Sequence, residues 1–127
     1  MNCRFYILHD RRGQVELKIR KTPDAIIIYL DGTLDLYNTA STGKGIHKLI
    51  SAETESNIII NLQDVDYINS SGIGLFINTN AILKKEHRKL ILCNMNKEIR
   101  RVLDMADILD LFDISDSEKE AVELIKK

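Results

Sequence analysis

The stretch YINSSGIGLF, residues 67–76, places two serines and two glycines between an apolar run and a segment of helical periodicity. The apolar run, residues 58–62, has the isoleucine-rich composition of a buried strand. The segment at residues 71–86 repeats apolar side chains at helical intervals. The stretch therefore predicts a strand that delivers Ser70 and Ser71 to the first turn of a helix, where unpaired amides and the positive end of the helix dipole lie.

Short β-rich runs alternate with helical patterns along the rest of the chain. Residues 15–21 alternate apolar and charged side chains, and residues 25–30 are almost wholly apolar. Turn-forming residues separate these two runs, so they predict an antiparallel hairpin. Further strands are expected at residues 58–62, 89–93 and 112–114, and a helix is expected at residues 39–51. Because strands that alternate with helices pair in parallel, we expect helices to cover the sheet.

The ends of the helices carry capping and charge signals. Asn94 or Asn96 is expected to cap a helix whose inner face holds Ile99, Val102, Leu103 and Ala106. Ser115 or Asp116 is expected to cap a terminal helix. The last turn of the helix at residues 71–86 is basic, and we interpret its cations as partners of the negative end of the dipole: Lys84, Lys85, His87 and Arg88.

Residues 1–14 precede this alternating pattern. Residues 5–8 (FYIL) indicate an extra edge strand, and the following charged residues and Gly13 indicate a turn. We therefore treat residues 1–14 as an N-terminal extension and residues 15–127 as the domain. An added strand or an ordered tail is preferred over a dedicated interaction segment.

Composition excludes several classes of function. A chain of 127 residues fits one domain, and its net charge of −1 provides no basic field for direct binding to nucleic acid. No apolar run approaches the roughly 20 residues that span a bilayer, so we expect no membrane insertion. The first residues lack the apolar core of a signal peptide, which leads us to expect a cytoplasmic location.

The cysteines and histidines give no sign of a metal or redox centre. Cys93 ends an apolar run and is expected to be a buried small side chain rather than a reactive thiol. The three histidines are scattered without the spacing of metal ligands. We therefore expect neither a metal site nor a cofactor.

Enzymatic interpretations of the serine turn meet obstacles. The hydrolase elbow needs a glycine two residues before the serine, where this chain has Ile68 or Asn69. His87 would lie roughly 24 Å away at the far end of the helix, and the position of His47 depends on the fold. The residues TGKG at 42–45 lack the earlier glycine of a P-loop, and we interpret them as a solvated turn of helix. We expect a protein that is not an enzyme.

Helix capping explains one or two of the polar residues in the turn. It does not explain Gly72 and Gly74, because a glycine in a helix costs up to about 1 kcal/mol relative to alanine. We interpret both glycines as exposing the backbone to close approach by another macromolecule or by a phosphate.

Three segments together resemble a STAS domain, and most of all the bacterial anti-sigma-factor antagonists. The first segment is LDGTLD, residues 30–35. The second is the apolar run at residues 58–62 followed by VDYINSSGIG at residues 65–74. The third comprises LILC at residues 90–93, IRRVL at residues 99–103 and LDLF at residues 109–112. Their order and spacing fit that family over residues 15–125.

The resemblance implies an α/β fold with a mixed sheet of four to five strands and about four helices packed mainly on one side. It also implies a partner-switching mechanism, in which the chain binds an anti-sigma factor that is also a serine kinase and thereby frees a sigma factor. The kinase would then phosphorylate Ser70, in preference to Ser71, and a phosphoserine phosphatase would reset the cycle. The implied partner-binding residues are Asp35, Asn69, Ser70, Ser71, Gly72, Ile73 and Gly74.

One position departs from the family pattern, because Asn69 stands where the motif usually has aspartate. Asparagine can still cap a helix, so we expect the local backbone to be retained. The alternative function is a STAS subunit that is never phosphorylated. It would act as a structural partner in a lipid-transport complex or a signalling scaffold.

Overall fold

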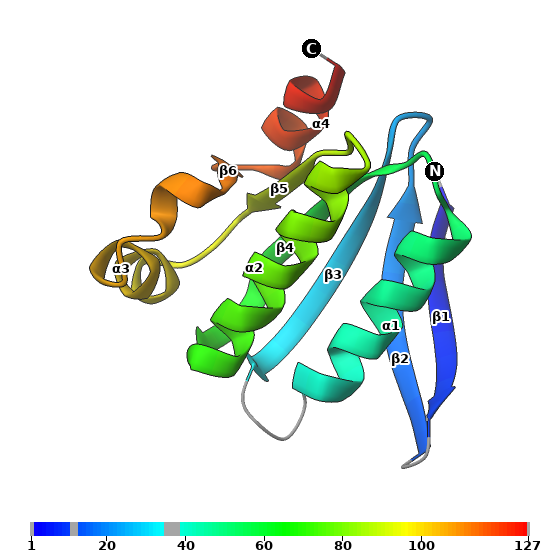
Figure 1. The fold of residues 1–127 in the computed structure, drawn as a ribbon, viewed down its shortest axis with the longest axis horizontal. Coiled ribbons are helices and arrows are strands. Elements are labelled where there is room, and N and C mark those ends of the chain that lie inside the picture. The colour runs from blue at the N-terminus through cyan, green and yellow to red at the C-terminus, as the bar shows by residue number, and fades with distance from the viewer. Residues whose placement is uncertain (1, 11–12, 35–38, 127) are drawn as a thin grey trace.

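Six strands form one mixed sheet, in which they follow one another in chain order (Figure 1). The computed structural model describes residues 2–10, 13–34 and 39–126, with side chains from residue 17 onward. The strands are β1 (Asn2–Asp10), β2 (Gly13–Lys21), β3 (Ala25–Leu34), β4 (Asn57–Ile68), β5 (Leu90–Cys93) and β6 (Asp113–Ser115). The pairs β1–β2 and β2–β3 are antiparallel, and the three later pairs are parallel. The expected hairpin and mixed sheet are confirmed, and β1 adds a further edge strand beside β2.

The helices cover the two faces of the sheet unequally. They are α1 (Thr39–Ala52), α2 (Ser70–Lys85), α3 (Lys97–Met105) and α4 (Glu118–Lys126), with a short 3-10 helix η1 (Leu109–Leu111) before β6. α1 and α2 run side by side over one face, and α3 contributes buried residues to the same core (Figure 1). We call this the α1–α2 side. α4 alone packs on the opposite face, which we call the α4 side.

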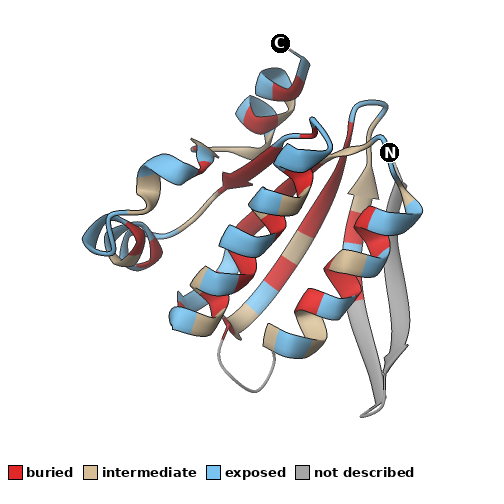
Figure 2. Ribbon diagram, in the orientation of Figure 1, coloured by how far each residue is buried: buried red, intermediate tan, exposed pale blue. Residues whose placement is uncertain are grey.

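Alternation along the strands divides the isoleucines between these two sides. Ile26 and Ile28 enter the core of the α1–α2 side, whereas Ile27 faces the α4 side. Phe76 of α2 is fully buried and meets Phe112 edge-on, with ring centroids 6.5 Å apart. Figure 2 shows the buried residues of α1 and α2 on the surfaces that face the sheet. Apolar burial therefore dominates this side.

The α4 side has a smaller apolar cluster. Its members are Ala25, Ile27, Ile59, Ile91, Cys93, Ala121 and Ile125, with Tyr29 and Val122 packed against them. Cys93 is fully buried, and desolvation raises the pKa of its thiol to about 12. The expectation that Cys93 is a buried small side chain is thus confirmed.

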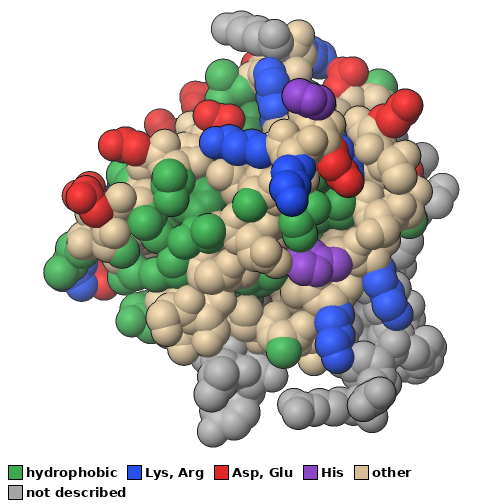
Figure 3. All heavy atoms as spheres, in the orientation of Figure 1, with side chains coloured by type: hydrophobic (Ala, Val, Ile, Leu, Met, Phe, Trp, Pro, Cys, Tyr) green, Lys and Arg blue, Asp and Glu red, His purple; other side chains and the backbone are tan. Residues whose placement is uncertain are grey.

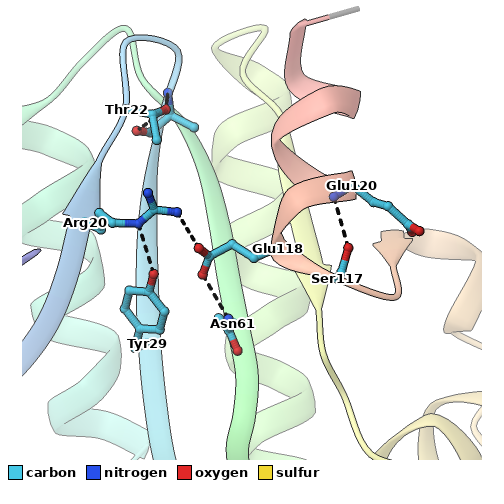
Figure 4. A network of polar contacts seen from close by, with 8 residues as sticks. Arg20, Thr22, Tyr29, Asn61, Ser117, Glu118 and Glu120 are labelled. Carbon is cyan, nitrogen blue, oxygen red and sulfur yellow. Dashed lines mark hydrogen bonds and ion pairs between the residues drawn. The ribbon is translucent and has the colours of Figure 1, made fainter. Parts of the chain in front are cut away.

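A polar network closes the edge of this smaller cluster (Figure 4). Glu118, at the start of α4, forms an ion pair with Arg20 of β2 and accepts a hydrogen bond of 3.0 Å from Asn61 Nδ2. Arg20 Nε also donates to the hydroxyl of Tyr29 at 3.3 Å. Burial raises the pKa of Glu118, but the hydrogen bonds and the Arg20 charge outweigh it and lower the pKa overall. The network therefore links α4 to the sheet through the ion pair of Glu118 with Arg20.

The structure selects among the expected caps and corrects two details. Asn96 caps α3, because its Oδ1 accepts from Ile99 N at 2.8 Å. Ala106 is exposed at the end of α3, so its expected inward position was wrong. Ser117, rather than Ser115 or Asp116, caps α4 by accepting from Glu120 N at 3.1 Å. The error arose because Ser115 is the last residue of β6, where its hydroxyl donates to the carbonyl of Ser117 at 2.8 Å.

Arg88 has a different role from the one expected. Its side chain is buried and donates to the carbonyls of Ile50, Glu53 and Ser56, at 3.2, 2.7 and 2.7 Å. It also pairs with Glu86. Arg88 therefore satisfies the carbonyls at the end of α1 rather than the dipole of α2, because the fold brings the two loops together.

Candidate functional site

The candidate site lies where β4 ends and α2 begins. Asn69 has extended backbone angles and caps α2, because its Oδ1 accepts from Ser71 N at 2.9 Å and from Gly72 N at 3.4 Å. The amide of Asn69 donates to the carbonyl of Leu34 at 3.1 Å, which ties the turn to the end of β3. The predicted strand–serine–helix arrangement and its asparagine cap are confirmed. An aspartate would cap through the same oxygen, so the change to asparagine removes a charge without removing the cap.

The two serines occupy different environments. Ser70 is the first residue of α2 and is exposed, whereas Ser71 is half-buried. Because Asn69 fills the cap, neither hydroxyl is needed for that purpose. Ser70 is thus the more exposed of the two serines, and it lies at the positive end of the helix dipole.

The two glycines have separate explanations. A Cβ on Gly72 would lie 3.0 Å from Leu34 Cβ and 3.2 Å from Ile68 Cβ, so glycine lets α2 pack closely on the ends of β3 and β4. A Cβ on Gly74 would meet nothing within 4 Å, and Gly74 is exposed. The interpretation that both glycines expose backbone to a partner is corrected for Gly72, which is buried by internal packing. Only Gly74 presents bare backbone to the outside.

The remaining predicted site residues fall into two groups. Ile73 is half-buried and packs against the main core, so its side chain supports the turn from within. The structure brings residues 69–74 together in the cap and the first turn of α2. Asp35, also predicted as a partner-binding residue, lies outside the described residues.

Two irregularities in the β3–β4 ladder shape the surface beside the serines. β4 runs to Ile68, well beyond the expected end at residue 62, and its register against β3 shifts between Tyr29 and Asp31 and again between Gly32 and Thr33. Gly32 has a φ of +75°, a conformation that favours glycine. The second shift pairs Thr33 with Tyr67 and leaves an extra residue in β4.

Tyr67 is a surface residue that the sequence patterns did not single out. Its side chain is 46% exposed, two residues before Asn69. Aromatic side chains are enriched at protein interfaces, so an exposed tyrosine here is a candidate contact. Its position directly before the polar turn was the available signal that Tyr67 could be a contact residue. Alternation along a regular strand, however, could not predict that its side chain is exposed.

Asn96 supports the same edge from α3. Its Nδ2 donates to the carbonyls of Val65 and Asp66, at 3.2 and 3.1 Å, while its Oδ1 caps α3. One side chain therefore fixes the start of α3 against the end of β4. A cap at Asn94 or Asn96 was expected from the sequence, but this second role was not, because the residues that Asn96 joins are about thirty positions apart.

The positions of the histidines and of the TGKG segment bear on the enzymatic alternatives. His47 Nε2 lies 3.3 Å from Asn78 Nδ2. Asn78 is eight residues after Ser70, or about 12 Å along the helix axis. Gly43 and Gly45 are buried in α1, and a Cβ on Gly43 would lie 3.2 Å from Leu75 Cδ1. The predicted turn of helix at residues 42–45 is confirmed and Lys44 in it is exposed, but the two glycines are buried rather than solvated, and Gly43 allows α1 to pack against α2.

Within residues 2–10, 13–34 and 39–126, no group of three or more His, Cys, Asp or Glu side chains could hold a metal ion. In the same part of the chain, every helix is too short or too polar to cross a membrane.

Comparison with known proteins agrees with this geometry. Residues 16–121 match the family model of the STAS domain. The anti-sigma-B factor antagonist of Bacillus subtilis is 28% identical over 101 residues, which are 80% of this chain and 91% of that protein. A proposed anti-sigma factor antagonist of Thermotoga maritima superposes with a TM-score of 0.81 at 21% identity, over 86% of this chain and 93% of that one. The Bacillus cell-fate determinant SpoIIAA in its phosphorylated form gives a TM-score of 0.66 at 23% identity, over 86% and 98% of the two chains.

Proposed function

The chain belongs to the STAS domain family, and from that premise we propose that it is an anti-sigma-factor antagonist. In this proposal it binds an anti-sigma factor that is also a serine kinase, and the bound sigma factor is released. Phosphorylation of Ser70 by that kinase dissociates the complex, and a phosphoserine phosphatase restores the binding form. The chain is the substrate and the switch rather than a catalyst, and it acts in the cytoplasm.

The exposure of Ser70 is the observation that carries this proposal. A kinase must reach the hydroxyl, and Ser70 is exposed whereas Ser71 is half-buried. A phosphate adds about −1.5 to −2 charges at neutral pH. At the first residue of a helix that charge meets the positive end of the dipole, so the fold can carry it.

The proposed binding surface surrounds this hydroxyl. Among the described residues it comprises Asn69, Ser70, Ser71, Ile73 and Gly74, with Gly72 shaping the turn from inside and Tyr67 as an added contact. Asp35, outside the described residues, is included on the family resemblance alone. In a docked complex, a phosphate on Ser70 would lose its hydration without gaining a matched partner. A change of about 2.7 kcal/mol is enough to weaken binding a hundredfold.

The test uses the purified chain, ATP and the candidate kinase encoded beside it. We expect mass spectrometry to locate one phosphate on Ser70, absent from Ser70→Ala and retained in Ser71→Ala. We expect the phosphorylated chain to bind the same kinase about a hundredfold more weakly in titration calorimetry. Phosphate on Ser71 alone would contradict the assignment of the switch.

The missing charge at Asn69 favours one alternative, a STAS subunit that is bound but never phosphorylated. That function predicts stable association with a partner and no turnover of phosphate. Binding of the kinase without phosphorylation would indicate a constitutive antagonist. Neither binding nor phosphate would favour a structural subunit in a lipid-transport complex or a signalling scaffold.

A further inference from the structure

β1 gives the sheet one long edge. It runs over nine residues, against three for β6 at the opposite edge. All of β1 pairs with β2 in one unbroken register, so no bulge interrupts the strand. Within residues 2–10, 13–34 and 39–126, no strand other than β2 pairs with β1, so its outer row of backbone amides and carbonyls has no strand partner there. Figure 1 shows β1 at the outer margin of the sheet.

The sequence of β1 lacks the features that protect an edge strand. Charged side chains, prolines and bulges commonly keep such a strand from pairing with another chain. β2 has charges of this kind at alternate positions, namely Glu16, Lys18 and Arg20. β1 has FYIL at residues 5–8 instead, and its segment at residues 4–10 contains neither proline nor glycine. A strand of this length and composition favours pairing with a further strand.

β1 also lies outside the part of the chain that the family model matches. That match begins at residue 16, within β2. Without β1, the charged β2 would form the edge of the sheet. The N-terminal extension therefore replaces an edge strand of alternating charge by one with an apolar centre, and the shared features of the family do not account for it.

The pairing of β1 with the same strand of a second copy has few possible registers. Side chains alternate between the two faces of a sheet, and residues directly opposite each other share a face. When a twofold axis normal to the sheet relates two antiparallel copies of a strand, even-numbered residues therefore lie opposite even-numbered ones. Odd-numbered residues lie opposite odd-numbered ones for the same reason. The axis must consequently pass beside a single residue, which lies opposite its own copy.

Charge selects one of these registers. With the axis at Ile7, Arg4 lies opposite Asp10 of the second copy. The same register sets Tyr6 opposite Leu8. An axis at Tyr6 would set Arg4 opposite Leu8, and an axis at Arg4 would set two arginines against each other. Opposite charges across a sheet stabilise it, whereas like charges destabilise it, so the register centred on Ile7 is the favoured one.

We propose that β1 pairs antiparallel with the β1 of a second copy of this chain, with the twofold axis at Ile7. Two six-stranded sheets then become one continuous sheet, and residues 4–10 of each copy contribute about six to eight backbone hydrogen bonds in all. The contact is self-complementary and each copy offers one such edge, so the assembly closes as a dimer. The added strand of the N-terminal extension is itself the interface.

This dimer leaves the proposed switch accessible. β2 and β3 lie between β1 and β4, so the strand that leads to Ser70 is about 14 Å from the paired edge. Figure 3 shows that the hydrophobic side chains of the helical face gather toward α3, on the side of the molecule away from β1. The inference therefore goes beyond the proposed function and does not depend on it. The dimer would carry two serine turns, each open to a partner.

A charge exchange in the full chain tests the edge and the register together. Arg4→Asp sets like charges opposite each other at both ends of the paired segment, and Arg4→Asp/Asp10→Arg restores opposite charges in exchanged order. Within one copy, Arg4 and Asp10 lie opposite Ile19 and Gly13 of β2, so neither substitution removes a directly opposite charge. Arg101→Asp, on the exposed side of α3, is the matched control because it changes the net charge equally.

Sedimentation equilibrium over a range of protein concentrations measures the dimer, after a thermal melt has verified folding of each variant. We expect Arg4→Asp to raise the dissociation constant of the dimer at least about tenfold. The double variant should return to within about threefold of the unaltered chain, and Arg101→Asp should stay within about twofold. High salt should reduce the difference between Arg4→Asp and the unaltered chain.

Amide hydrogen exchange of the unaltered chain is a second measurement, and it needs no substitution. In a single copy, β1 directs alternate amides toward β2 and the others outward. We expect the outward amides of residues 4–10 to exchange more slowly as the protein concentration rises through the dissociation constant. Exchange that is independent of concentration would contradict the pairing.

Each other outcome of these measurements also has a defined meaning. A monomer at every concentration, or oligomers larger than the dimer, overturns the proposal. A dimer that Arg4→Asp and Arg101→Asp affect equally, or that the double variant does not restore, overturns the register and the edge contact with it. None of these results affects the proposed function, which phosphorylation of Ser70 and binding of the kinase test separately. A dimer that behaves as expected but accepts no phosphate overturns the proposed function alone.

Discussion

The two faces of the sheet are held to their helices by different kinds of interaction. On the α1–α2 side, large apolar side chains such as Phe76 and Ile46 are fully buried. On the α4 side, the apolar cluster is small and the ion pair of Glu118 with Arg20 closes its edge. Apolar burial scales with area and is indifferent to pH, whereas a partly exposed ion pair responds to pH and salt. The face that carries the proposed switch therefore depends mainly on apolar burial for its stability.

The largest expected effect compares one apolar truncation on each side. Phe76→Ala should lower the free energy of unfolding by about 4 kcal/mol, because it leaves a cavity between α2, the sheet and Phe112. Ile125→Ala, near the end of α4, should cost about 2 kcal/mol, at the lower limit for such truncations. Urea unfolding followed by circular dichroism measures both. Equal losses of unfolding free energy in the two variants would show that apolar burial on the two sides contributes equally to stability.

The second comparison concerns two arginines. Arg88→Met should cost about 2–3 kcal/mol, because it leaves carbonyls at the end of α1 without a donor in a buried place. Arg20→Met on the α4 side should cost under about 1 kcal/mol, because its ion pair is partly exposed. Matched urea titrations at one pH give both values. A larger loss for Arg20→Met would reverse the ranking of the two sides.

The third prediction tests the serine turn with one substitution at two positions. Gly72→Ala should destabilise the chain by about 1–2 kcal/mol, because its Cβ would press on Leu34 and Ile68. Gly74→Ala has open space around it and should stabilise α2 by up to about 1 kcal/mol. Thermal melts should therefore shift in opposite directions. Shifts of the melting temperature in the same direction for both variants would contradict the distinction between the buried Gly72 and the exposed Gly74.

The smallest expected effect is the pH dependence of the α4 side. The folded-state pKa of Glu118 lies below its ordinary value of 4.5, so its carboxylate stabilises the fold at higher pH. That contribution is lost as the pH falls through the folded-state pKa. Glu118→Gln should thus cost under about 1 kcal/mol at pH 7, and the difference should vanish in acid. Urea titrations of both proteins from pH 7 to about pH 3 measure it, and a constant difference would contradict this assignment.

Local signals predicted the elements and the geometry of the serine turn. The asparagine cap, the two serines at the start of α2 and the β2–β3 hairpin all depend on neighbours within a few residues. The residues that determine these hydrogen bonds and this periodicity therefore lie within short windows of the sequence. The burial of Cys93 followed from its apolar run in the same way.

Long-range contacts account for the errors. Arg88 was assigned to the end of its own helix, but it binds carbonyls more than thirty residues earlier. Gly72 and Gly74 could not be distinguished from the sequence alone. In the structure, Leu34 of β3 lies against Gly72 but not against Gly74. Gly43 was expected to be solvated, but Leu75 of α2 lies against it. In each case the deciding neighbour lies far away in the chain.

The sequence by itself determined the family, the mixed α/β fold and a capped serine turn at a helix start, because capping and alternation act within a few residues. Only the tertiary structure decided which serine is exposed and which glycine is open. These properties depend on what packs against each residue from distant segments. One face of α1 and one face of α2 are buried against the sheet, so the lysines of these helices lie on the exposed face. Packing against the sheet, rather than either helix alone, therefore decides which face is exposed.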